Sequence, residues 1–137
     1  MEWTRDEYTI TDDRAGMRLD AIKSLLDTTY WAAGRSMETV EAIVANSLCF
    51  GMFHKDRQIG FARVVTDGAA FSWLCDVVLE ETYRNKGLGS WMMDVVLAHP
   101  KIAFTEIVLR TNGSESLYAR KGFKEFEEMT FMGKKSG

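Results

Sequence analysis

The most constraining feature of this chain is the passage from an apolar run through a glycine loop into an apolar helical segment. Residues 70–79 form the run, and residues 91–97 form the segment. Between them, Gly87 and Gly89 lie in the loop at residues 84–90. Glycines let a backbone approach an anion without an intervening Cβ. A helix N-terminus adds N–H groups and partial positive charge. The passage therefore predicts a site for a phosphate-bearing molecule.

The spacing of the glycines excludes the two common nucleotide loops. There is no G-x-x-x-x-G-K-[ST] motif, so the loop is not a P-loop. Met92 stands where the dinucleotide fingerprint needs its third glycine. The preceding run also belongs to a series of hairpins and does not open a βαβ unit. The ligand is thus a phosphate compound of another kind.

Composition narrows the class of protein further. The 137 residues are 46% hydrophobic and 27% charged, with a net charge of −3 and a pI of about 5.4. These values predict a globular protein without a broad nucleic-acid-binding face. No apolar run reaches the roughly 20 residues that span a bilayer, and the polar N-terminus is not a signal peptide. We expect a cytoplasmic protein that binds no membrane, with Cys49 and Cys75 reduced and no metal site.

The periodicity predicts one domain, residues 1–137, of mixed α and β elements. Strands are expected at 8–11, 48–53, 59–65 and 70–79, the last three as an antiparallel meander. A further strand is expected at 104–109, and two weaker ones at 123–126 and 129–132. Helices are expected at 17–26, 36–46, 87–98 and 114–121, with Ser36 as an N-cap and Pro100 as a stop signal.

Two motifs together resemble a known family. Arg84-x-x-Gly87-x-Gly89 is followed, one strand and one helix later, by Leu-Tyr-x-x-x-Gly-Phe at residues 117–123. The pair, and the order of elements over residues 4–132, is similar to the GNAT superfamily of N-acetyltransferases. The resemblance implies an α+β fold. Its central, mostly antiparallel, twisted sheet has six to seven strands and about four flanking helices.

The resemblance also implies that acetyl-CoA is the phosphate compound. In this family the loop amides hold the pyrophosphate, and the open edge of the preceding strand pairs with the pantetheine. By motif position the edge is Val77, Val78 and Leu79, and Asn112 lies where polar residues contact the pantetheine arm. The implied pyrophosphate loop consists of Arg84, Asn85, Lys86, Gly87, Leu88, Gly89 and Ser90.

Tyr118 matches the general acid of the family, which protonates the departing thiolate. A phenol suits this role because its ordinary pKa of about 10 keeps it protonated at neutral pH. The alternative is that Tyr118 only packs in the interior.

Asp76 is a candidate general base because it is the one carboxylate in its apolar run. A buried charge is costly without a partner, which favours either catalysis or a hydrogen-bonded role that orders its surroundings. Both roles remain open at this stage, and Glu106 is a second candidate base.

The segment between the first two helices covers the acceptor pocket in the family. Here it supplies Tyr30, Trp31 and Arg35. Arg35 is suited to hold a carboxylate or phosphate, and an aromatic ring to stack on the acceptor. Trp73 is expected to line the same pocket. The alternative is that these residues only pack and cap the helices.

The leading hypothesis is an acetyl-CoA-dependent enzyme that acetylates a primary amine of a small molecule by direct attack in a ternary complex. One alternative is acetylation of a protein or peptide amine. Another is a CoA-binding module without catalysis. The resemblance also allows a homodimer.

Overall fold

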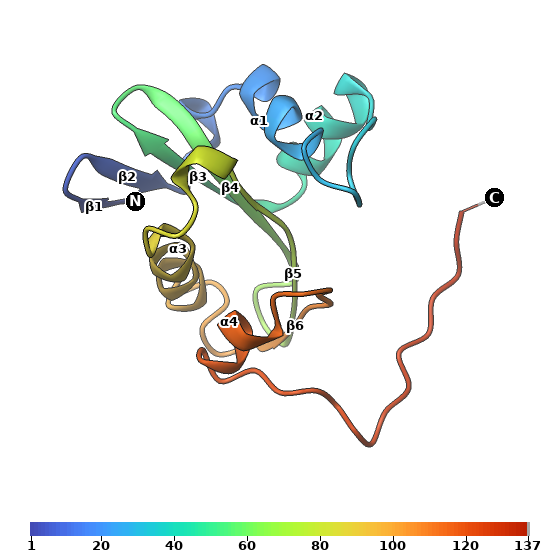
Figure 1. Ribbon diagram of the computed structural model, residues 1–137. Helices are drawn as coiled ribbons and strands as arrows, with labels where there is room; N and C mark the ends of the chain where they lie inside the picture. Colours follow the sequence, from blue (N-terminus) through green and yellow to red (C-terminus); the bar gives the residue numbers. More distant parts are fainter. Residues whose placement is uncertain (137) are drawn as a thin grey trace.

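The computed structural model describes residues 1–136, which are built around one six-stranded sheet (Figure 1). The strands lie in chain order. The first four pairs are antiparallel, and β5 and β6 run parallel. This confirms the expected α+β fold with a mostly antiparallel sheet. The strands are β1 (Glu2–Arg5), β2 (Tyr8–Thr11), β3 (Leu48–His54), β4 (Arg57–Thr66), β5 (Phe71–Leu79) and β6 (Glu106–Val108).

Helices cover both faces of the sheet. Figure 1 shows α1 and α2 on one side of the strands and α3 on the other. Ser36 caps α2 by accepting from the N–H of Thr39, at 3.1 Å, as expected. Across residues 1–136, every helix is too short or too polar to cross a bilayer. The helices are α1 (Leu19–Leu26), α2 (Met37–Ala45), α3 (Leu88–Leu97) and α4 (Glu115–Ala119), with single 3₁₀ turns η1 (Arg14–Gly16) and η2 (Glu81–Tyr83).

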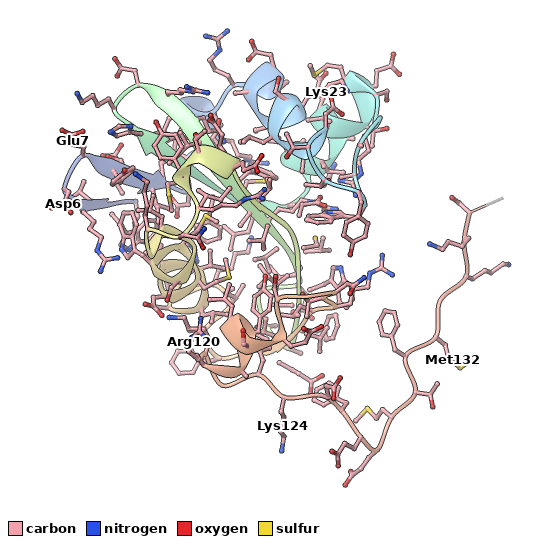
Figure 2. All side chains as sticks on the ribbon, viewed as in Figure 1. Asp6, Glu7, Lys23, Arg120, Lys124 and Met132 are labelled. Carbon is pink, nitrogen blue, oxygen red and sulfur yellow. The ribbon has the colours of Figure 1, made fainter. Side chains whose placement is uncertain are left out.

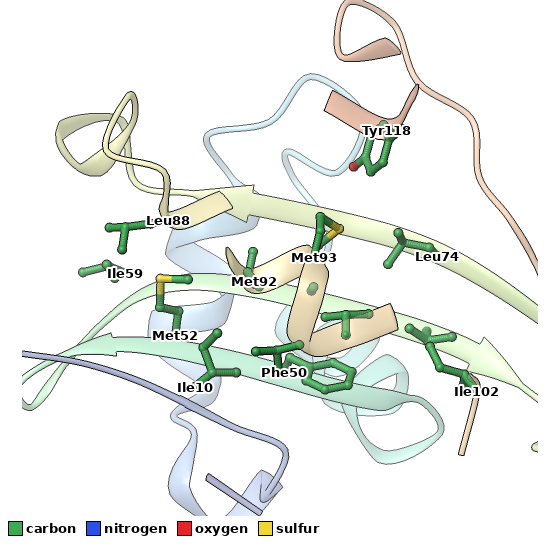
Figure 3. Packing of buried hydrophobic residues seen from close by; sticks show 14 residues of the cluster. Ile10, Phe50, Met52, Ile59, Leu74, Leu88, Met92, Met93, Ile102 and Tyr118 are labelled. Atoms are coloured by element: carbon green, nitrogen blue, oxygen red, sulfur yellow. The ribbon is translucent and has the colours of Figure 1, made fainter. Parts of the chain in front are cut away.

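Two hydrophobic clusters fill the space between the sheet and its helices. The cluster under α3 is drawn in Figure 3, where Met92 and Met93 pack over strand residues such as Phe50. The cluster under α1 and α2 includes Ile22 and Phe61. Alternate residues of the central strands therefore serve opposite faces, as a sheet buried on both sides requires.

A bulge in β5 changes the face of the sheet to which alternate side chains point, so that residues before and after it pack on opposite faces. Phe61 of β4 pairs with Val78, and Arg63 pairs with Cys75, so one residue of β4 lies opposite two of β5. Asp76, the first of these two, has a φ of 51°, in the left-handed region that Asp tolerates better than most residues. As a result Leu74 packs under α3 but Val78 packs under α1 and α2.

The strand β1 was not expected from the sequence. It pairs with β2 through a tight turn in which Asp6 has a φ of 54°. Among its residues, Trp3 packs against the cluster under α3. A short, polar edge strand with one anchoring side chain leaves little periodic signal, which explains why it was missed.

The two final strands expected at 123–126 and 129–132 are wrong for the described residues. Residues 123–136 form no sheet pairing. They follow the outside of the molecule (Figure 1), where Phe123 contacts Tyr118 and Phe131 stacks on Trp73. Met132 is exposed on this segment (Figure 2). The apolar side chains there have strand propensity but no partner strand, and propensity alone does not form a sheet. The expected strand at 104–109 is also shorter, with bounds Glu106–Val108.

Candidate active site

A cavity of about 700 Å³ opens where β5 and β6 part. The two strands pair as far as Trp73 and Val108, and in the described chain β5 then continues with β4 as its one strand neighbour. The cavity brings together residues that are far apart in the sequence and that the sequence singled out separately. They are Tyr30, Trp31, Arg35, Trp73, Asp76, Val77, Asn112 and Tyr118.

Asp76 is the centre of a hydrogen-bonded cluster in the wall of this cavity. Its side chain is 2% exposed. Trp31 Nε1 donates to Oδ1 at 3.0 Å, and Arg35 Nη1 donates to Oδ2 at 2.8 Å. Arg63 Nε donates to the same Oδ2, and Arg63 Nη1 also donates to Ser47 Oγ at 3.1 Å. The cluster thus ties the α1–α2 segment to β4 and β5.

These partners decide the protonation state of Asp76. Burial alone would raise the pKa of the carboxyl, but hydrogen bonds and charges from Arg35 and Arg63 outweigh burial and hold the pKa below its ordinary value. A carboxylate with a low pKa and three donors on its two oxygens is a weak base. The geometry therefore favours the second of the two expected roles, in which Asp76 orders its surroundings. Glu106 is exposed and lies outside the cavity lining.

Tyr118 enters the cavity from α4. It is 9% exposed and belongs to the cluster under α3, where it lies beside Met93 and Leu74 (Figure 3). Phe123 supports the ring by an edge contact, with the centroids 5.8 Å apart. Burial raises the pKa of the phenol above its ordinary value. Tyr118 therefore remains a proton donor throughout the neutral range, which suits a general acid.

The glycine loop leads into an N-terminus of α3 that carries no side-chain cap. Gly87, at the N-cap position, has a φ of 77°, in the left-handed region that favours glycine. Asn85 also has a positive φ, of 64°. A Cβ built on Gly87 or Gly89 meets no atom within 4 Å, so open space lies in front of both. Free N–H groups at an uncapped helix start are suited to bind an anion.

A second cavity, of about 500 Å³, lies at this helix start. It is lined by Lys86, Gly87, Leu88 and Ser90, together with residues of β1, β2 and α3. Arg84, also in the predicted loop, turns back instead. Its Nε donates to the carbonyl oxygen of Leu79 at 3.1 Å. The N–H of Glu80, in the same peptide unit, donates to Ile59 of β4, so the Leu79 oxygen points away from β4. Val78 is buried under α1 and α2, and by the same alternation its backbone N–H and carbonyl face Phe61 of β4 and not this edge.

Comparison with known proteins decides the family. The sequence profile of the acetyltransferase (GNAT) domain matches residues 45–125, more than half of the chain. The chain belongs to the GNAT acetyltransferase family. This confirms the resemblance of the two motifs, and with it the expectation of an N-acetyltransferase.

Individual relatives agree with the profile. A crystal structure of a candidate GNAT acetyltransferase from Xanthomonas campestris is 34% identical, with a TM-score of 0.83 over 88% of this chain and 86% of that one. A candidate acetyltransferase of Gibberella zeae is 26% identical over 95% of this chain and 86% of its own length. A GNAT acetyltransferase from Elizabethkingia anophelis, solved with acetyl-CoA bound, has the same fold. It is 19% identical, with a TM-score of 0.64 over 86% of this chain and 75% of that one.

Sequence reasoning missed three basic residues of this GNAT acetyltransferase that line the larger cavity: Arg63, Arg110 and Lys135. Arg63 carried a usable signal, because it is a charge in an apolar strand, as Asp76 is. Two opposite charges in adjacent apolar strands predict an ion pair. Arg110 and Lys135 carried no such signal, since they lie in polar surroundings and only the tertiary fold brings them to the cavity.

The aromatic residues of the acceptor side divide into two groups. Tyr30 and Trp31 pack edge to face, with centroids 5.1 Å apart. Trp73 stacks on Phe131 of the C-terminal segment at 5.9 Å, and the Arg110 guanidinium carbon lies 5.9 Å from the centre of the same Phe131 ring. The cavity thus has aromatic and cationic groups on two sides.

Cys75 also lines the cavity, next to Asp76. Burial raises the pKa of its thiol to about 11. The thiolate is the nucleophilic form of cysteine, so at neutral pH Cys75 is almost entirely in its unreactive form. Neither cysteine is in a disulfide. This favours direct transfer over a covalent relay through Cys75.

Proposed function

We propose that this protein is an acetyl-CoA-dependent N-acetyltransferase that acetylates a primary amine of a small molecule by direct attack in a ternary complex. The observation that carries the proposal is the parting of β5 from β6 after Trp73. This parting leaves an open strand edge between the glycine loop and a cavity that contains Tyr118. The family and the acetyl-CoA-bound neighbour support the choice of acetyl donor. A cytoplasmic location belongs to the proposal too.

The residues present fit acetyl-CoA as a substrate. Open space lies in front of Gly87 and Gly89, and the backbone amides of residues 85–90 would hold the pyrophosphate, whereas the amide of Arg84 already donates to Glu81. The edge at Val77 and Leu79 has backbone groups that no strand pairs with, although the Leu79 carbonyl accepts from Arg84, and the two amides of a pantetheine arm would complement them. Asn112 lines the same cavity and would bind the arm from the other side.

The cavity also supplies what amide formation needs. The bulge leaves the N–H of Val77 without a regular ladder partner, and this donor would polarise the thioester carbonyl. The phenol of Tyr118 would donate its proton to the sulfur as the carbon–sulfur bond breaks. Tyr30, Trp31, Arg35 and Trp73 would hold the acceptor. The amine proton passes to solvent, because Asp76 is already engaged.

The test measures the free thiol released from acetyl-CoA with a panel of amines, amino acids, amino sugars, polyamines and lysine peptides. We expect release with at least one small amine. Preference for lysine peptides would instead support acetylation of proteins. Acetyl-CoA binding by calorimetry without thiol release for any acceptor would support a binding module and contradict the proposal.

A further inference from the structure

The larger cavity is strongly cationic in a protein that is acidic overall. Among its lining residues in the described part of the chain, Asp76 is the one carboxylate, whereas Arg35, Arg63, Arg110 and Lys135 are basic. The whole chain has a net charge of −3. A cavity whose charge opposes that of the whole molecule concentrates oppositely charged ligands.

Asp76 does not neutralise the two guanidinium groups beside it. Arg35 and Arg63 both donate to its Oδ2, so two positive charges share one negative charge. Arg63 is fixed by a further bond to Ser47 and is 14% exposed. Arg35 is 28% exposed, and within residues 1–136 its guanidinium bonds through Nη1 alone. Arg35 therefore has Nε and Nη2 left to bind a ligand.

We propose that the acceptor of this enzyme is an amine that also carries an anionic group, a carboxylate or a phosphate, and that Arg35 binds this anion with Arg110. The proposal rests on the proposed function. A guanidinium that Asp76 holds in place offers a rigid pair of N–H donors, which suits both kinds of anion. Arg110 is held from the opposite element by the ring of Phe131.

The phosphates of acetyl-CoA do not account for these cations. The glycine loop has its own cavity at the start of α3, with Lys86 and Arg5 in its lining. The two cavities share no lining residue. The basic residues around Asp76 are thus available to a second anion, and the cavity in which they lie also contains Tyr118.

The experiment compares matched acceptors at saturating acetyl-CoA. Phosphoethanolamine with ethanolamine tests the phosphate, and an amino acid with its amide tests the carboxylate. Each kcat/KM is corrected to the unprotonated amine. We expect the anionic member of at least one pair to be preferred by about 10-fold or more, the range for hydrogen bonds to charged groups. Which pair shows the preference identifies the anion.

Variants assign the preference to residues. Arg35→Gln keeps a hydrogen-bonding side chain but removes the charge, and we expect it to reduce the ratio of anionic to neutral kcat/KM by about 10-fold. Arg110→Gln, on another element, tests the same ratio if Arg35→Gln does not fold. Arg18→Gln is the matched control, because Arg18 is exposed and pairs with Asp20 away from the cavity. It should keep the ratio of the unmodified enzyme.

Equal or better use of the neutral amines, or a ratio unchanged in both cavity variants, would overturn the anionic acceptor and leave the acetyltransferase standing. Preference for lysine peptides would overturn it as well. Absence of thiol release with every amine would instead show that the proposed function itself has failed.

Discussion

Tyr118 is the residue whose chemistry can be removed with the least disturbance. Tyr118→Phe keeps the buried ring and its contact with Phe123 but deletes the hydroxyl. We expect kcat to fall by about 100-fold, a usual contribution of general acid catalysis, while the Kd for acetyl-CoA in calorimetry stays within a factor of two. An unchanged kcat would remove Tyr118 from the mechanism.

Asp76 is best tested by a change that keeps its shape. Asp76→Asn retains a residue that tolerates a φ of 51° but leaves Arg35 and Arg63 without their counter-charge. We expect the free energy of unfolding in urea to fall by about 3 kcal/mol, as for one lost member of a buried pair. The dependence of kcat on pH should keep its shape. A profile that loses its acidic limb would restore Asp76 as general base.

The pH dependence of turnover follows from the same two groups. The lowered pKa of Asp76 keeps it ionised, and the raised pKa of Tyr118 keeps it protonated, throughout the neutral range. Neither group changes charge there, so kcat/KM should rise with pH along the titration of the acceptor amine. Acceptors with different amine pKa values are the check. A midpoint that stays the same for all of them would show that a group of the enzyme titrates instead.

Single residues also show what the sequence could and could not predict. Asp76 stood out because a charge in an apolar run needs a partner, and the structure supplies Arg35 and Arg63. The choice between base and anchor was beyond the sequence, since it depends on how many donors converge on one carboxylate. The bulge at Asp76 was equally hidden, because it arises from the pairing of two whole strands.

At the scale of elements, the start of α3 can be tested by its effect on acetyl-CoA binding. Gly89 has an ordinary φ and open space around its position, so Gly89→Ala should leave the melting temperature equal or slightly higher. The added methyl group should nevertheless weaken acetyl-CoA binding by about 10-fold, roughly 1.4 kcal/mol, because the ligand must approach the backbone there. Gly87→Val would mix this effect with strain at a φ of 77°. Calorimetry measures the affinity.

Gly16→Ala is the matched control for that prediction. Gly16 lies in η1, outside both cavities, and a Cβ there would contact Thr11 at an ordinary 3.9 Å. The affinity of the Gly16→Ala variant for acetyl-CoA should equal that of the unmodified protein. If Gly89→Ala also binds as tightly as the unmodified protein, the loop does not hold the pyrophosphate.

The elements that the sequence predicted are those with strong local signals. The meander of β3, β4 and β5 follows apolar runs separated by polar turns, and the Asp67 side chain closes the last turn by accepting from three backbone N–H groups. The errors fall where pairing partners decide the outcome. β1 forms because β2 is beside it, whereas residues 123–132 remain unpaired despite apolar and aromatic side chains.

At the scale of the whole molecule, one buried and one partly buried carboxylate join segments that are distant in the chain. Asp76 connects the α1–α2 segment to β4 and β5. Asp12, after β2, accepts from His99 Nε2 at 2.8 Å, at the end of α3. Burial alone would raise the pKa of Asp12, but hydrogen bonds from the Met1 ammonium and His99 outweigh it and lower the pKa. Both carboxylates thus stabilise the fold in their ionised form.

This arrangement predicts how the whole protein responds to acid. A carboxyl whose pKa is lower in the folded chain binds fewer protons there than in the unfolded chain, so protonation favours unfolding. The free energy of unfolding should therefore be nearly constant from about pH 7 to 5 and fall below about pH 4, where unfolded Asp residues titrate. Urea titrations at each pH measure it. Asp76→Asn should lower the plateau and make the acid decline less steep, because one of the linked groups is gone. An equally steep decline would mean that Asp76 has the same pKa in both states, which would contradict its ion pairs with Arg35 and Arg63.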